Sequence, residues 1–257
     1  DWIPGLEEQP NYNNKNKPLI GPQDFNELPL DEVTIAEVLK SVGYKTFYSG
    51  KWHLGSEGYY PEDQGFDINI GGFEKGSPMG GYYSPYKNPK LEDGPEGEYL
   101  TDRLTQETID FIDSRDESKP FAAFLAFYNV HTPIQENKEF YDYYVEKLNG
   151  YDDIEPVTRK EGDAITRLNQ RNPKYASMVN ATDNNVGKII NYLKKNNLYD
   201  NTLIVFTSDN GGLTTQNRIA PTSVYPLRAG KGWLYEGGIK IPQLIKLPKQ
   251  VYREIIY

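Results

Sequence analysis

The stretch FAAFLAFYNVHTP at residues 121–133 is an apolar run that leads directly into a histidine, His131. Two further runs have the same form: YKTFYSGKWHLG at residues 44–55 leads into Lys-Trp-His, and TLIVFTSDNGG at residues 202–212 leads into Asp-Asn. Short apolar runs bounded by polar and glycine residues predict buried strands. Because ligands bind at the carboxyl ends of strands in an open α/β sheet, the three polar exits predict one shared site.

A helical pattern precedes each of the three runs. Apolar residues recur at helical spacing over residues 33–39, 101–112 and 175–195, and Thr101 is the expected N-cap of the second segment. Three helix-to-strand units in series predict parallel strands joined by right-handed crossovers. The expected fold class is therefore α/β, with a largely parallel central sheet flanked by helices.

We expect this α/β core to span residues 28–247. Two long segments interrupt it: residues 59–97 are rich in Gly, Pro and Tyr, and residues 136–173 are charged and weakly periodic. Long segments of this kind in a compact domain predict functional loops or excursions. Residues 1–27 are expected to form an irregular surface segment, and residues 248–257 a tail.

Composition excludes several classes of partner. The 257 residues carry a formal net charge of −9 and no Lys/Arg-rich block, so nucleic acid and anionic membrane surfaces are not expected partners. No run of about twenty apolar residues occurs, so no membrane span is expected. With no cysteine, these residues hold no disulfide, thiolate metal site or cysteine nucleophile. The 21 tyrosines indicate either contacts with sugars or ordinary amphipathic packing.

The pair Asp209 and Asn210 supplies one carboxylate and one amide oxygen, which are ligands that Ca²⁺ and Mg²⁺ prefer. Calcium takes about six to eight ligands, so two oxygens do not complete its shell. Alone, Asp-Asn-Gly-Gly is more often a turn than a metal site. A metal site here therefore depends on what else the fold brings to this strand end.

Two lysines and the two histidines lie near the predicted strand ends, where they can supply positive charge and transfer protons. Lys51 precedes His53 by two positions, and Lys231 lies in a Gly-rich loop that begins near Arg228. Each has an ordinary alternative: a solvated lysine, a hydrogen-bonded core histidine or a simple Gly-rich loop. Together with His131, they predict a pocket that binds a small tetrahedral dianion and moves protons around it. Hydrolysis of a sulfate or phosphate ester fits that pocket.

Four motifs resemble, in the same order, those of the type I sulfatases, a family of the alkaline-phosphatase-like superfamily. They are GKWHLG at residues 50–55, VHTP at 130–133, FTSDNGG at 206–212, and the loop of residues 228–242 with the pattern Arg-x-Gly-Lys-x-x-x-x-Glu-Gly-Gly. The resemblance covers the chain from Leu28 to Pro242, and four motifs in order are specific.

The resemblance implies an alkaline-phosphatase-like sandwich and a role for each candidate residue. Asp209 and Asn210 would bind Ca²⁺, while Lys51 and Lys231 would hold the sulfate oxygens. Arg228 is a weaker candidate for charge in the same pocket.

The resemblance also gives the two histidines separate tasks. His131 would assist the leaving oxygen, and His53 would take a proton from the geminal hydroxyl of the family's formylglycine nucleophile. A sulfated carbohydrate substrate and a periplasmic or secreted location are further implications of the family. The sugar, the position of its sulfate, exo or endo action and the oligomeric state stay open.

The sequence also departs from the family pattern. Formylglycine is made from Cys or Ser within Cys/Ser-x-Pro-Ser-Arg, and neither that motif nor the paired-aspartate metal motif before it occurs here. The C-terminal subdomain of the family has no counterpart either. We therefore expect a partial sulfatase catalytic domain over residues 1–257 that is inactive alone, with the missing motifs encoded just upstream.

Three hypotheses follow from these observations. The first is an internal piece of an active, calcium-dependent sulfatase that acts on sulfated carbohydrate. The second is a truncated, non-catalytic homologue that binds sulfated ligands. The third is a phosphate or phosphonate ester hydrolase of the same superfamily.

Overall fold

The computed structural model describes residues 25–249 and has the expected α/β architecture. Residues 1–24 of the expected N-terminal segment and residues 250–257 of the expected tail lie outside the described residues. The central sheet is parallel and has the strand order β2-β1-β3. Its strands are β1 (Lys45–Gly50), β2 (Ile68–Ile70) and β3 (Phe121–Ala126).

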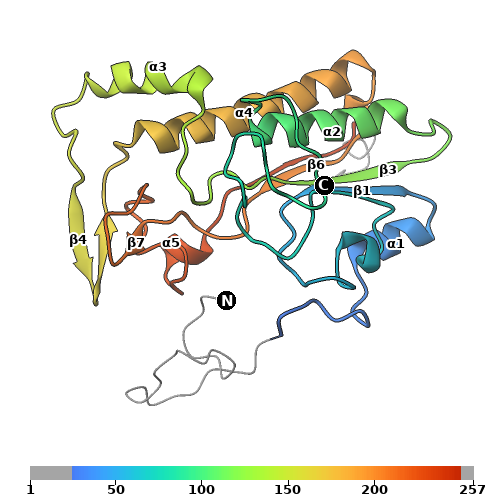
Figure 1. Cartoon of the computed structure of the whole chain (residues 1–257), viewed down its shortest axis with the longest axis horizontal. Coiled ribbons are helices and arrows are strands. Elements are labelled where there is room, and N and C mark those ends of the chain that lie inside the picture. The colour runs from blue at the N-terminus through green and yellow to red at the C-terminus, as the bar shows by residue number, and fades with distance from the viewer. Residues whose placement is uncertain (1–24, 250–257) are drawn as a thin grey trace, which may run out of the picture.

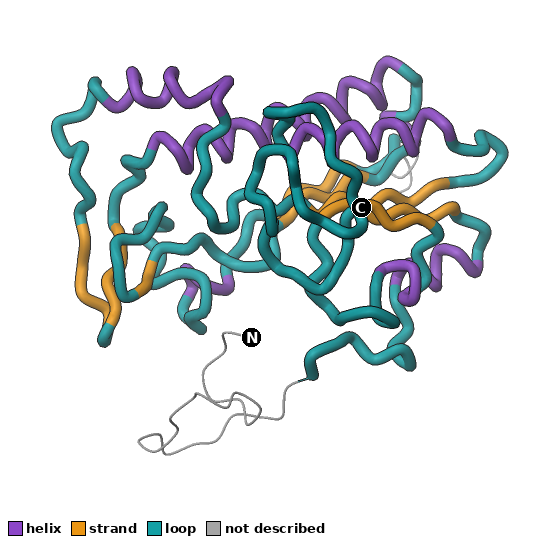
Figure 2. Tube along the Cα trace, viewed as in Figure 1, coloured by secondary structure: helices purple, strands orange, loops and turns teal. Residues whose placement is uncertain are grey.

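Helices cover both faces of this sheet. The long helices α2 (Leu100–Ser114) and α4 (Pro173–Lys195) lie along one face, and the short helix α1 (Ile35–Ser41) lies against the other (Figures 1 and 2). The alternation of β1 side chains explains the two layers, because successive residues of a strand point to opposite faces. Phe47 stacks on Phe111 of α2 with ring centroids 4.5 Å apart, whereas the next residue, Tyr48, packs in a cluster with Ala36 of α1.

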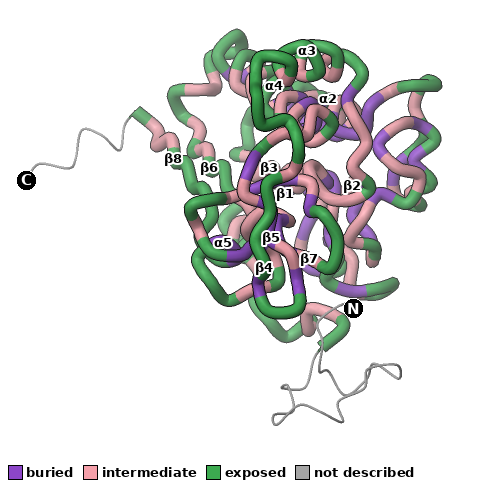
Figure 3. Tube along the Cα trace, turned by 90° about the vertical axis from the view of Figure 1, so that its left-hand side faces the viewer, coloured by how far each residue is buried: buried purple, intermediate pink, exposed green. Residues whose placement is uncertain are grey.

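The third apolar run does not join the parallel sheet as expected. It forms β6 (Ile204–Thr207), which pairs antiparallel with β8 (Gln243–Lys246) in a separate two-stranded sheet. Figure 3 shows this pair at the edge of the molecule, with much of its length exposed. Val205 is 51% exposed and Leu244 is 66% exposed, so these apolar residues are not buried in a central sheet as the apolar run predicted. The short 3-10 helix at Tyr199–Asn201 connects α4 to β6.

The segment 136–173 is not a loop throughout, contrary to the expectation. It contains helix α3 (Lys138–Leu148) and a hairpin of β4 (Thr158–Glu161) and β5 (Ala164–Arg167), to which β7 (Thr215–Gln216) adds a third strand. No residue of α3 is fully buried, although Phe140 packs against the core from this helix. The segment 59–97 holds only a 3-10 helix at Pro61–Gln64 and β2, and helix α5 (Glu236–Ile239) lies before β8.

The segment 59–97 packs its tyrosines into a core that it shares with α2 and α4. Tyr82, Tyr86 and Tyr99 are at most 4% exposed and pack with Leu91 and Leu104. For these tyrosines the structure supports the packing interpretation and not the sugar-contact one.

Two smaller expectations about helices can be compared with the structure. Helix α2 begins at Leu100 after Tyr99, so Thr101 is not its N-cap; its hydroxyl instead donates to the side-chain oxygen of Asn129 at 2.8 Å. Within residues 25–249, no helix is both long and apolar enough to cross a bilayer.

Candidate active site

Close backbone contact between β1 and β3 fixes the first exit. Gly50 has a φ of +103°, and a Cβ on it would lie 2.0 Å from the carbonyl oxygen of Ala126. Lys51 donates its backbone N–H to that same oxygen at 2.8 Å, so its side chain starts beside the end of β3. His53 follows with a φ of +62°, which is uncommon for a residue with a Cβ, and its N–H donates to the Phe73 carbonyl at 3.1 Å.

Packing from two sides places the residues around His53. A Cβ on Gly76 would lie 2.5 Å from Nδ1 of His53, so the segment 59–97 presses directly against the imidazole ring. Trp52 is buried, meets Tyr48 edge to face with centroids 5.2 Å apart, and donates its indole N–H to the carbonyl of Tyr59 at 2.8 Å. Trp52 therefore anchors the exit in the core between Lys51 and His53.

Backbone groups also orient His131 after β3. Its N–H donates to the Tyr128 carbonyl at 2.8 Å, and its Nδ1 lies 2.9 Å from the carbonyl oxygen of Thr132. Because a carbonyl only accepts, Nδ1 carries the proton of the neutral ring and Nε2 is left as the basic nitrogen. The buried Tyr82 hydroxyl lies 2.8 and 2.9 Å from the carbonyl oxygens of Tyr128 and His131, so it ties the segment 59–97 to this exit.

The lysine loop, residues 228–238, lies on the strand end that carries Asp209. Gly211 N–H donates to the Gly238 carbonyl and Lys231 N–H to the Gly212 carbonyl, each at 2.9 Å. A Cβ on Gly211 would lie 1.8 Å from the carbonyl oxygen of Gly237, so only glycine permits this approach. Lys231 is thereby fixed next to the Asp209 exit.

The charges of the candidate residues act on one another, which shows that the structure brings them together. Burial lowers the pKa of Lys51, the carboxylate of Asp209 raises it, and Lys231 lowers it again. Burial, then the charges of Lys51 and Lys231, lower the pKa of His53. Burial likewise lowers the pKa of His131, and the same two lysines add to the effect. Both histidines are therefore predominantly neutral at pH 7, in the form that accepts a proton.

Arg228 is engaged elsewhere. Its guanidinium donates to the buried Glu161 carboxylate at 2.7 Å and lies 3.8 Å from the ring centroid of Tyr235. This pair holds the start of the lysine loop against the β4–β5 hairpin. The structure thus shows a positioning contact for Arg228, while its predicted contact with substrate stays a prediction.

Asp209 and Asn210 are the candidate metal ligands. They offer oxygen donors of the right type, but residues 25–249 contain no group of three or more His, Cys, Asp or Glu side chains arranged to hold an ion. The two residues fit calcium as part of a site whose remaining oxygens must come from other groups.

Sequence reasoning missed the groups that orient the candidate residues. Glu161, Gly76 and Tyr82 come from segments assigned as loops, and Thr132 acts through its backbone carbonyl. The Gly-rich composition of 59–97 was the only signal of a close backbone approach.

Comparison with known proteins gives a consistent result. The profile of the family described as Sulfatase matches residues 6–254. Arylsulfatase J of Mus musculus is 31% identical over 90% of this chain and 37% of its own length, and N-acetylgalactosamine-6-sulfatase of Homo sapiens is 28% identical over 87% and 41%. The crystal structure of Ps i-CgsB in complex with k-i-k-neocarrahexaose has a TM-score of 0.64 and 32% identity, covering 89% of this chain and 50% of its own. The chain thus spans half or less of the length of these proteins.

Proposed function

Because the chain belongs to the sulfatase family and has that family's alkaline-phosphatase-like fold, we propose that it supplies the sulfate-binding and proton-transferring residues of an enzyme that hydrolyses sulfuric esters of carbohydrates. One observation carries this proposal. Two lysines and two histidines come from three separate loops, and the charges of Lys51 and Lys231 lower the pKa of both histidines, while Asp209 and Lys231 act on the pKa of Lys51.

In this proposal Lys51 and Lys231 hold the sulfate group. Both are half-buried, so their ammonium groups act at reduced dielectric on the negative charge of the sulfate oxygens. A lysine stabilises that charge without giving up its proton. Burial is the main cause of the lowered pKa of Lys51, and repulsion from Lys231 adds to it; a dianion between the two lysines relieves that repulsion.

The histidines move protons at two different atoms. His131 assists the leaving oxygen through Nε2, since Nδ1 is occupied by the Thr132 carbonyl. Nε2 is unprotonated in the neutral ring that predominates at pH 7, so the ring must take up a proton before it donates one, and its lowered pKa then makes it a stronger acid. His53 takes a proton from the hydroxyl of the nucleophile so that sulfate is released. The family's formylglycine nucleophile arises from a Cys or Ser motif that residues 1–257 do not contain, so the proposal concerns a longer protein that includes them.

Calcium is a further part of the proposal. Asp209 and Asn210 would hold it, and the ion would add positive charge next to the sulfate. Support comes from the oxygen chemistry of the pair. Loading the full-length protein with calcium should raise its melting temperature, and Asp209→Asn should abolish that rise; a rise that survives the substitution would contradict the assignment.

A sulfated carbohydrate is the proposed substrate class. Support comes from the similar proteins, one of which is named for N-acetylgalactosamine-6-sulfate chemistry and another of which was crystallised with k-i-k-neocarrahexaose. A periplasmic or secreted location is proposed because sulfatases of this family are mostly exported. Cell fractionation of the full-length product checks that location, and recovery in the cytoplasm alone would contradict it.

The test compares hydrolysis of an aryl sulfate and an aryl phosphate by the full-length gene product. Lys231→Gln and His53→Gln should each lower aryl sulfate turnover about 100-fold or more. Lys119→Gln, an exposed lysine at the opposite end of β3, is the matched control and should have no effect. Faster cleavage of the phosphate ester would favour the phosphate or phosphonate hydrolase.

The second candidate is a non-catalytic protein that binds sulfated ligands, because Lys51 and Lys231 could hold a sulfate group without any nucleophile. The coding sequence just upstream decides between the two. An acidic pair followed by Cys/Ser-x-Pro-Ser-Arg supports the enzyme. A full-length product that lacks both, binds sulfated sugars and does not hydrolyse them is the second candidate.

A further inference from the structure

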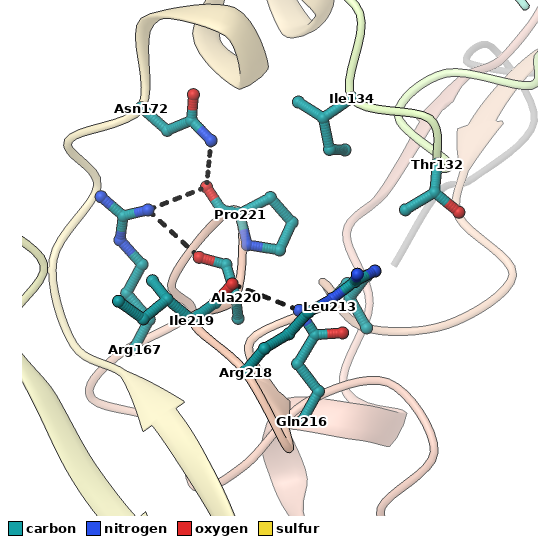
Figure 4. Close-up of a pocket in the computed structure, with 10 residues that line it drawn as sticks. All are labelled: Thr132, Ile134, Arg167, Asn172, Leu213, Gln216, Arg218, Ile219, Ala220 and Pro221. Atoms are coloured by element: carbon teal, nitrogen blue, oxygen red, sulfur yellow. Dashed lines mark hydrogen bonds between the residues drawn. The ribbon is translucent and has the colours of Figure 1, made fainter.

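A cavity of about 280 Å³ lies directly beside the candidate active site (Figure 4). Its wall includes Thr132, which follows His131 and accepts the hydrogen bond from its ring. The other walls come from the chain between β5 and α4 and from residues 213–221, which follow the Asp209 exit. A volume near 300 Å³ is at the lower end for ligand pockets and suits a single sugar ring.

The cavity carries positive charge that no carboxylate balances. Its lining includes Arg167 and Arg218 and contains no Asp or Glu. Neither arginine forms an ion pair with a carboxylate in the part of the chain that the structure describes. A lining of this kind selects an anion over a neutral or cationic group.

Arg167 shows that this charge is built into the structure. It is only 4% exposed, and its guanidinium donates to the backbone carbonyls of Asn169 at 2.9 Å and Ala220 at 3.1 Å. Burial lowers the pKa of the Arg167 guanidinium, and the nearby Arg171 lowers it further. An anion in the cavity would offset both effects, whereas the carbonyl contacts fix the wall in place.

Arg218 is the cation that can reach a ligand directly. Its side chain is exposed, and Figure 4 draws it among the residues that line the cavity. Thr132, Asn172 and Gln216 contribute a hydroxyl and two amide groups to the lining of the cavity, and Ile134 adds an apolar surface. Hydroxyl and amide groups beside an apolar surface match a hydroxylated ring, and the guanidinium matches an oxyanion on that ring.

We propose that this cavity is a subsite for a sugar unit that bears its own anionic substituent, so that the substrate is a carbohydrate with at least two negative groups. One group occupies the Lys51 and Lys231 site, and the second lies against Arg218. This inference rests on the proposed sulfatase function for its first group. A sulfate or a uronic carboxylate would satisfy the second position by the same chemistry.

Binding of matched disaccharides to the full-length protein tests the subsite without requiring turnover. Isothermal titration would compare a singly sulfated disaccharide with one that has a second sulfate and one that has a uronic carboxylate. We expect about tenfold tighter binding of at least one doubly anionic ligand, and the stronger of the two identifies the substituent. Equal affinity for all three ligands would overturn the proposal.

Substitutions locate the effect. Arg218→Gln should lower the preference for the doubly anionic ligand about tenfold, Arg218→Lys should retain part of it, and Lys119→Gln should leave it intact. A preference that Arg218→Gln does not change would refute the subsite. If the protein hydrolyses no sulfate ester but keeps this preference, the proposed function fails while the anionic subsite stands.

Discussion

The replacement of Gly211 by alanine tests how the lysine loop is held on the Asp209 strand end. The new Cβ would lie 1.8 Å from the carbonyl oxygen of Gly237. Since van der Waals contact lies at about 3.5 Å, the two backbones must separate by about 1.7 Å. Overpacking of this kind costs about 1–3 kcal/mol, and weakening the hydrogen bonds from Gly211 to Gly238 and from Lys231 to Gly212 adds about 1 kcal/mol. We expect a loss of about 2–4 kcal/mol in the free energy of unfolding.

Gly187→Ala is the matched control for this substitution. Gly187 lies within α4, and a Cβ there meets no atom within 4 Å. The same chemical change should therefore stabilise the protein by about 0.5–1 kcal/mol through helix propensity. Urea unfolding of the full-length gene product, followed by circular dichroism, gives both values. If Gly211→Ala stays within about 0.5 kcal/mol of the parent, the close approach does not hold the loop and the reasoning is refuted.

Three further substitutions have expected outcomes. His53→Gly removes a residue with a φ of +62°, so urea unfolding should show a stability within about 1 kcal/mol of the parent or above it, while aryl sulfate turnover falls about 100-fold or more. The pKa of His131 is lowered in the folded state, so at a pH below about 6.5, the ordinary pKa of histidine, the unfolded chain binds more protons than the folded one. The free energy of unfolding therefore falls as the pH drops through that value. His131→Gln should flatten this dependence in urea midpoints measured at about pH 5.5 and 7.5. At Asp67, burial opposes ionisation, but the Thr46 N–H and Lys40 outweigh it and hold the pKa of the carboxyl at about 2. Asp67→Asn should therefore lower the free energy of unfolding by about 1–2 kcal/mol at neutral pH. The difference from the parent should vanish as the pH falls from about 4 through about 2.

Hydrophobic period was sufficient to predict the core of the fold. The apolar run of β1 lies at the centre of the described sheet and that of β3 pairs beside it, and α2 and α4 have one buried face each. The partner of β6 could not be predicted in the same way. Strand pairing is a contact between backbone edges, and an apolar run has the same composition whether its neighbour is β3 or β8.

In the candidate site, too, the positions of the main residues could be predicted from the sequence, but the contacts that orient them could not. Lys51 follows β1 directly and His131 follows the loop after β3, so the rule that strand ends share an edge was enough to place them together. The contacts that orient them have little sequence signature, because the acceptors are the backbone carbonyls of Thr132 and Ala126. Glu161 was missed for a different reason. Its segment gives weak periodicity, and only the fold brings it to Arg228, 67 residues further along the chain.

The backbone acceptor of His131 has a consequence for mutational robustness. Where a carboxylate side chain orients a histidine, a single substitution can remove that partner, so that the proton is no longer held on one ring nitrogen. Here the Thr132 carbonyl sets the tautomer, and every amino acid brings the same carbonyl to position 132. The side chain of Thr132 is therefore free to diverge toward new ligands in the adjoining cavity while the protonation pattern of its neighbour is inherited unchanged. Substrate preference and proton transfer can evolve separately at two consecutive residues.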